Sequence, residues 1–126
     1  MFNFAGTRPN NLGVSDGKLT PCPGTPNCVN SQSEAPQSKI EPLPAVSISE
    51  LQKVVEGMER TTIIESTDNY LYAEFKTKLM GFVDDVEFYL DRQENVIHVR
   101  SASRLGKSDL GLNRQRVEEI RAKLKQ

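Results

Sequence analysis

Hydrophobic and polar residues alternate regularly between residues 61 and 102 of this 126-residue chain. Such alternation predicts β-strands, because successive side chains on a strand point to opposite faces of a sheet. We predict four strands, at residues 61–66, 70–77, 82–90 and 96–102. The short connections between them, rich in Asp, Asn and Gly, favour an antiparallel meander.

Two segments with helical periodicity flank these strands. Before them, apolar residues recur from Ile48 to Met58, and Ser47 with Glu50 forms a capping-box pattern, which predicts a helix over about 48–59. After them, a stripe of Val117, Ile120 and Leu124 predicts a second helix over about 113–125, with Asn113 as its N-cap.

The order α-β-β-β-β-α, with one apolar face per strand, predicts an α+β fold. We expect a two-layer sandwich, in which a four-stranded antiparallel sheet carries both helices on one face. The expected core residues are Leu71, Phe75, Val86, Phe88, Ile97, Val99, Val117 and Ile120.

The first 46 residues have a different character, because they contain all seven prolines. Proline lacks the backbone donor that helices and central strands need. We therefore predict a Pro-rich, irregular N-terminal arm at 1–46 and an α+β domain at 47–126. The arm is either flexible or wrapped around the domain, and scattered apolar residues such as Leu12, Leu19 and Ile40 favour partial wrapping.

The sheet face opposite the helices is predicted to be polar and aromatic. It is either solvated, covered by the arm, or in contact with a partner. The mixture of tyrosine and arginine favours coverage or partner contact, because both are enriched at interfaces. The residues expected on this face are Tyr70, Tyr72, Glu74, Lys76, Asp85, Glu87, Tyr89, His98 and Arg100.

Cys22 and Cys28 are the only cysteines. A disulfide and two reduced thiols are equally compatible with their spacing. A metal site is disfavoured, because two thiols and the single His98 are too few for a closed zinc shell, and no metal or cofactor is expected. Free thiols would fit a cytoplasmic protein, whereas a disulfide would indicate an exported or lumenal one.

Charge and hydropathy exclude several classes of protein. A formal net charge of −1 gives no global field for nucleic acid. The chain contains no run of 18 apolar residues, so no transmembrane helix is predicted. The first residues lack the pattern of an intact signal peptide. A small anion or a protein is the expected partner.

Polar residues and glycines concentrate in the segment RSASRLGKSDLGLNR, residues 100–114. Glycine, serine and arginine ahead of a helix N-terminus are the components of an anion site. The favoured alternative is a network of Arg–carboxylate pairs that only fixes the loop, and we predict that Arg104 forms a bidentate pair with Asp84 or Asp109. The candidate ligand-binding residues are Arg100, Ser101, Ser103, Arg104, Asp109, Asn113, Arg114, Asp84 and Asp85.

The segments GFVDDVEF and CPGTPNCVNSQ, together with this loop, resemble domain-of-unknown-function family 1499, which occurs in bacteria and in plastid-targeted plant proteins. The resemblance spans about Leu19 to Leu124. The family motif S-A-S-R-x-G-x-x-D-x-G-x-N-R is matched from Ser101 to Arg114. Some relatives look membrane-attached or exported, and the resemblance implies no particular activity, substrate or cofactor.

Three functions are compatible with these observations. We favour a non-catalytic binding or scaffold domain that acts through the loop or the polar sheet face. An enzyme that processes an anion or small molecule would use Asp84 or Asp109 with Arg104. Adjacent residues on a strand face opposite ways, so Asp84 and Asp85 make a poor acid–base pair. Nucleic-acid binding is disfavoured by the charge.

Overall fold

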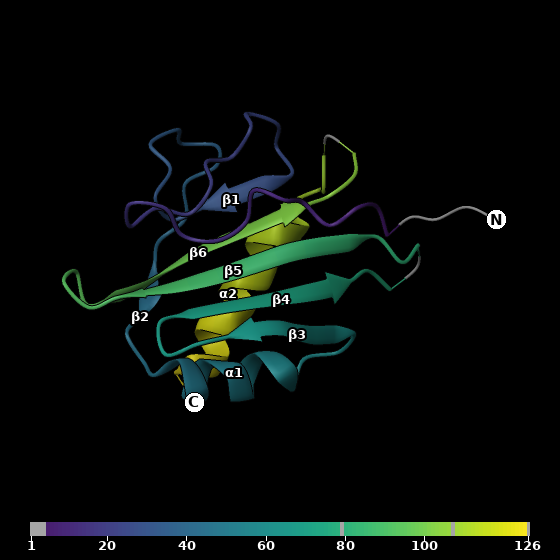
Figure 1. The fold of residues 1–126 in the computed structure, drawn as a ribbon. Coiled ribbons are helices and arrows are strands. Elements are labelled where there is room, and N and C mark those ends of the chain that lie inside the picture. Colours follow the sequence, from purple (N-terminus) through teal and green to yellow (C-terminus); the bar gives the residue numbers. More distant parts are fainter. Residues whose placement is uncertain (1–4, 79, 107, 126) are drawn as a thin grey trace.

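The computed structural model describes residues 5–78, 80–106 and 108–125. It is an α+β fold with one mostly antiparallel sheet and two helices (Figure 1). The elements are β1 (Cys28–Asn30), β2 (Leu43–Pro44), α1 (Ile48–Glu56), β3 (Thr61–Ser66), β4 (Tyr70–Lys76), β5 (Val83–Asp91), β6 (Val96–Ser103) and α2 (Leu112–Leu124).

The sheet has six strands, two more than the sequence predicted. β3 to β6 form the expected antiparallel meander, and β1 and β2 both pair with β6 at the far edge. Both added strands belong to the Pro-rich segment and have two or three residues, too few for a visible alternation. Pro44 is tolerated in β2 because an edge strand does not need every backbone donor.

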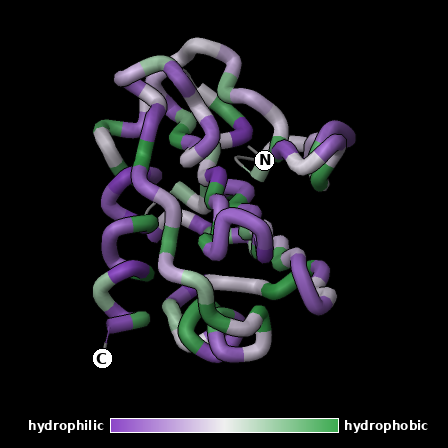
Figure 2. Tube along the Cα trace, turned by 90° about the vertical axis from the view of Figure 1, so that its left-hand side faces the viewer, coloured by the Kyte–Doolittle hydropathy of each residue, from purple (hydrophilic) through white to green (hydrophobic). Residues whose placement is uncertain are grey.

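Both helices pack on one face of the sheet, which we call the inner face. All eight predicted core residues belong to one buried cluster, joined by Ile48, Leu51 and Val55 of α1. Figure 2 shows the layers from the side, with the C-terminal helix α2 along the left. Within the described residues, neither helix is long and apolar enough to cross a membrane.

The chain ahead of α1 crosses the opposite, outer face of the sheet. Figure 1 shows this purple segment in front of β5 and β6, with α2 behind the sheet. Leu19 is buried against Tyr70 and Tyr72, and Gly13 N donates to Glu87 Oε1 at 2.7 Å. The N-terminal segment therefore contacts the outer face at these positions. The Pro-rich arm and its partial wrapping stay predictions. The predicted division of the chain at residue 46 stays a prediction.

The two cysteines form a disulfide in this structure. Cys28 begins β1 and is 1% exposed, whereas Cys22 is half-buried. The bond closes a ring that contains Pro23 and Pro26.

Candidate functional site

We call the segment Ser101–Arg114 the motif loop. Several of its side chains form a buried polar network with neighbouring residues on the inner face, beneath the start of α2. Arg116 donates to Asp84 Oδ2 at 2.7 Å and to Asn113 Oδ1 at 2.7 Å. Its guanidinium also stacks on the ring of Phe75, 4.8 Å from the centroid. Ser101 Oγ donates to the same oxygen of Asn113 at 2.6 Å. Burial raises the pKa of Asp84 although Arg116 opposes the shift.

Gly111, rather than Asn113, occupies the N-cap position of α2, so the predicted N-cap is wrong. The Asp109 side chain accepts hydrogen bonds from the backbone at the start of the helix. Asp109 Oδ1 accepts from Gly111 N at 2.8 Å, and Oδ2 accepts from Asn113 N at 3.1 Å. Gly111 occupies the N-cap position with φ 82°, a left-handed conformation that favours glycine. Burial opposes the shift, but the hydrogen bonds from Asn113 and Gly111 lower the pKa of Asp109 below its ordinary value.

Arg104 forms the predicted bidentate pair, but with a different carboxylate. Its Nε and Nη2 donate to the two oxygens of Asp85, each at 2.9 Å, and Nη2 also contacts Glu74. The predicted partners Asp84 and Asp109 are wrong, because they serve Arg116 and the cap of α2 instead. The hydrogen bond to Asp85 raises the pKa of Arg104.

The motif loop also ties the N-terminal segment to the sheet. Asn113 Nδ2 donates to the carbonyl of Asn27 at 3.2 Å and to Ser103 Oγ at 3.0 Å. Arg114 donates to the carbonyls of Lys39 at 2.9 Å and Gln37 at 3.2 Å.

The candidate residues are therefore divided between the two faces of the sheet. Ser101, Asn113 and Asp84 meet on the inner face, whereas Arg104, Asp85 and Arg100 lie on the outer one. Among the described residues, Arg104 makes no hydrogen bond to Asp84 or Asp109, and the enzyme hypothesis stays a prediction.

Arg116 and Asn27 are central to the network, and the sequence analysis missed both. Arg116 lies three residues after Asn113, the spacing at which helix side chains meet. That spacing was the available signal for Arg116. Asn27 belongs to an irregular segment whose path no periodicity predicts.

Glu87 and Arg100 form an incompletely paired couple beneath the N-terminal segment. Arg100 Nη1 lies 4.0 Å from Glu87 Oε2, and the side chains are 9% and 0% exposed. Among the described residues, Glu87 Oε2 and Arg100 Nε have no hydrogen-bond partner. Burial raises the pKa of Glu87 and lowers that of Arg100, because a charged group loses hydration there.

A groove of about 770 Å³ lies beside this couple, between the N-terminal segment and β3 to β5. We call it the tyrosine groove, because Tyr70, Tyr72 and Tyr89 line it. Arg8 and Ile64 also line it, from the N-terminal segment and β3 respectively. The remaining lining residues are Pro9, Asn10, Leu12, Gly13, Val14, Glu65, Thr67 and Asn69.

Two of the three tyrosines are anchored by buried carboxylates. Tyr70 donates to Glu87 Oε1 at 2.7 Å, and Tyr72 donates to Asp85 Oδ1. Burial, followed by these hydrogen bonds, raises the pKa of both phenols. Tyr89 is half-buried, and its hydroxyl makes no hydrogen bond within the described residues. The groove thus presents rigid aromatic walls and one free phenol.

Arg8 lies at the edge of the groove and links it to the motif loop. Its guanidinium carbon is 5.9 Å from the centroid of the Tyr72 ring, and its Nη2 is 2.7 Å from Glu74 Oε2. Arg104 contacts the same carboxylate oxygen. Burial opposes the shift, but the hydrogen bonds from Arg8 and Arg104 lower the pKa of Glu74.

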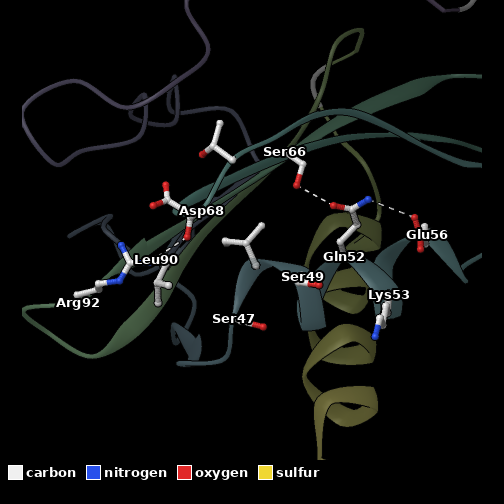
Figure 3. Close-up of a pocket in the computed structure, with 11 residues that line it drawn as sticks. Ser47, Ser49, Gln52, Lys53, Glu56, Ser66, Asp68, Leu90 and Arg92 are labelled. Atoms are coloured by element: carbon white, nitrogen blue, oxygen red, sulfur yellow. Dashed lines mark hydrogen bonds between the residues drawn. The ribbon is translucent and has the colours of Figure 1, made fainter.

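A second hollow, of about 440 Å³, lies on the helix side between α1 and the β3–β4 hairpin (Figure 3). Its polar groups bind one another. Ser66 Oγ donates to Gln52 Oε1 at 2.7 Å, and Gln52 donates on to Glu56. Arg92 donates to the carbonyl of Asp68 at 3.1 Å. These groups are engaged with one another rather than directed together at a ligand.

Asp91, Glu94 and His98 bring ligand atoms within 4.8 Å of one another at the β5–β6 hairpin. Asp91 Oδ1 already accepts from the backbone of Glu94 at 3.1 Å. The His98 ring bonds Glu94 at 2.8 Å and Ser31 at 2.9 Å. These hydrogen bonds fix the hairpin turn, and the expectation that no metal is bound stays a prediction.

Comparison with curated proteins and with solved structures gave no match. A family model does match, over residues 18–124, which include β1, the whole motif loop and all of α2. Its description is "Protein of unknown function (DUF1499)". The chain therefore belongs to the DUF1499 family.

Proposed function

We propose that this protein is a non-catalytic binding domain that holds a segment of a protein partner in the tyrosine groove. The observation that carries the proposal is the set of three tyrosines that line one groove, together with the Tyr89 hydroxyl, which makes no hydrogen bond to any described residue. Tyrosine gives large contact area at low cost in conformational entropy, and a phenol without a partner supplies a directional hydrogen bond.

The rigidity of the groove supports this proposal. Tyr70 and Tyr89 face each other across β4 and β5, and Tyr72 lies on the same face two residues further along. Because Glu87 and Asp85 anchor two of the rings, a partner would bind without paying to order them.

The arrangement of charged groups favours a protein, rather than a small anion, as the binding partner. The guanidinium groups of the motif loop are already engaged, Arg104 with Asp85 and Arg114 with backbone carbonyls. An anion site needs donors that are free to reach the ligand. We therefore assign the motif loop to the stability of the fold and the groove to binding.

A peptide selection tests the proposal. A displayed random-peptide library would be panned on the immobilised wild-type protein, and the affinities of selected peptides measured by calorimetry. We expect Tyr89→Ala to weaken binding by about tenfold or more, the effect of losing one well-packed aromatic contact. Lys53→Ala, at an exposed position of α1, is the control. If the selected peptides bind Tyr89→Ala as tightly as wild type, the assignment of binding to the tyrosine groove is refuted.

A further inference from the structure

The Cys22–Cys28 disulfide closes the ring that holds Asn27 against the motif loop. Asn27 Nδ2 donates to the carbonyl of Gly106 at 2.7 Å. The carbonyl of Asn27 accepts from Ser103 N at 3.0 Å and from Asn113 Nδ2 at 3.2 Å. Asn27 is therefore the point at which the disulfide ring is joined to the motif loop.

Few other contacts hold this ring in place. Thr25 Oγ1 donates to Asn27 Oδ1 at 2.7 Å, which is a contact within the ring. β1 begins only at Cys28 and pairs three residues with β6. The residues between Cys22 and Asn27 belong to no helix or strand. The covalent closure between Cys22 and Cys28 therefore acts together with the hydrogen bonds of Asn27 in fixing the position of that residue.

The two sulfurs differ in accessibility. Cys28 is 1% exposed in β1, whereas Cys22 is half-buried. Cys22 lines a hollow of about 380 Å³ with Lys18, Pro21 and Gly24. A thiolate can reach a disulfide only along an open path, so the approach is through this hollow to Cys22.

We propose that the Cys22–Cys28 disulfide is a thiol–disulfide exchange site, and that its reduction by an external dithiol releases Asn27 from the motif loop. One thiolate of the dithiol attacks the sulfur of Cys22, and the Cys22–Cys28 bond breaks. Cys28 leaves as a thiolate and takes up a proton. The second thiolate of the dithiol then attacks the other sulfur of the dithiol, which is bonded to Cys22 in the mixed disulfide, and Cys22 leaves as a thiolate and takes up a proton. The protein gains two electrons and two protons, and the dithiol becomes a disulfide.

The consequence is local. Reduction removes the closure but leaves the β3–β6 meander and the buried core untouched, because both cysteines lie outside that core cluster. The amide of Ser103 should then lose protection, since its acceptor is the Asn27 carbonyl. The amide of Leu90, bonded to the Asn69 carbonyl at 2.9 Å, should keep its protection.

Hydrogen exchange measured by NMR, with dithiothreitol as the dithiol, tests this proposal. Under native conditions we expect complete reduction, alkylation of Cys22 before Cys28, and exchange of the Ser103 amide faster by about tenfold or more. The Leu90 amide should not change. The double variant Cys22→Ser, Cys28→Ser should show the same fast exchange at Ser103 and no response to dithiothreitol.

Three results would overturn the proposal. The first is a disulfide that reacts only after denaturant unfolds the domain. The second is full reduction with unchanged exchange at Ser103. The third is an equal acceleration of amide exchange at Ser103 and Leu90. That result would show that the disulfide stabilises the whole fold rather than the contacts of Asn27 alone.

Discussion

The two faces of the sheet differ in how completely their buried charged side chains are paired. On the inner face, Asp84 and Arg116 are joined at 2.7 Å, and Arg116 also reaches Asn113 and Ser101. On the outer face, Arg100 Nη1 lies 4.0 Å from Glu87 Oε2, and each side chain has a buried atom without a hydrogen-bond partner among the described residues. A closed network specifies one structure, whereas a partly satisfied one leaves buried charge uncompensated.

The difference indicates where binding belongs. The motif loop contributes Ser101 and Asn113 to the closed inner network and sends Arg104 to the outer face. Its motif residues are thus engaged within the chain. The outer face combines incomplete pairing with an open groove and a free phenol. We interpret the loop as the device that fixes the fold and the outer face as the surface that meets a partner.

Breaking the inner pair should give the largest effect. Arg116→Met would leave the Asp84 carboxylate buried without its cation, at a cost of about 3–5 kcal/mol in unfolding free energy. Adding Asp84→Asn should recover only part of this loss, because Arg116→Met also removes the donors to Asn113 and Ser101. Urea unfolding of both variants measures this. Full recovery in the double variant would show that the inner network is a simple pair.

A double-mutant cycle on Glu87 and Arg100 of the outer face should show more recovery of stability than the cycle on Asp84 and Arg116. Arg100→Met should cost about 2–3 kcal/mol, because it leaves Glu87 charged and buried. Adding Glu87→Gln should recover most of that loss, since Gln keeps an oxygen for Gly13 N and Tyr70. The comparison between the faces fails if this cycle shows no more recovery than the inner one.

Arg104→Lys should have a smaller effect, about 1–2 kcal/mol, because lysine cannot reproduce the two-point contact with Asp85. Thermal melting with and without phosphate or sulfate measures the change. Neither anion should shift the melting temperature of wild type. The control is Arg92→Lys, whose exposed side chain makes one bond to a carbonyl. A wild-type shift with phosphate that Arg104→Lys abolishes would indicate an anion site.

The cap of α2 should give the smallest effect and a definite pH dependence. Asp109→Asn should cost about 1 kcal/mol at pH 7, because an amide nitrogen cannot accept the hydrogen bonds that Asp109 Oδ2 receives from Asn113. The folded-state pKa of Asp109 is lowered, so its contribution is present above the ordinary value of 3.8 and is lost as pH falls through the folded-state pKa. The stability difference from wild type should shrink below pH 3.8. Gln115→Ala, uncharged and exposed on α2, is the control, and a difference that grows in acid would contradict this assignment.

The meander and its core were predictable because period-2 alternation directly reports which side chains are buried. The predicted core residues, from Leu71 to Ile120, lie in one cluster. β1 and β2 were not predictable, because two or three extended residues between prolines carry no period.

Pair assignments failed for a related reason. The composition of the loop correctly suggested that Arg104 is held by a carboxylate. The choice among Asp84, Asp85 and Asp109 depends on which face the loop crosses after β6, and sequence spacing does not encode that path. The tyrosines were correctly placed on the polar face, but the groove exists only because the N-terminal segment forms its opposite wall.

The central claim is that the tyrosine groove, and not the motif loop, binds the partner. The most direct test is to titrate the ¹⁵N-labelled protein with a peptide from the selection and to map the changes in backbone amide chemical shift. We predict shifts at Tyr70, Tyr72, Tyr89 and Ile64, saturating at the calorimetric Kd, with Ser101 to Ser103 and Asn113 unmoved. Shifts concentrated in Ser101–Arg114, with the tyrosines unmoved, would place binding in the motif loop and contradict the account.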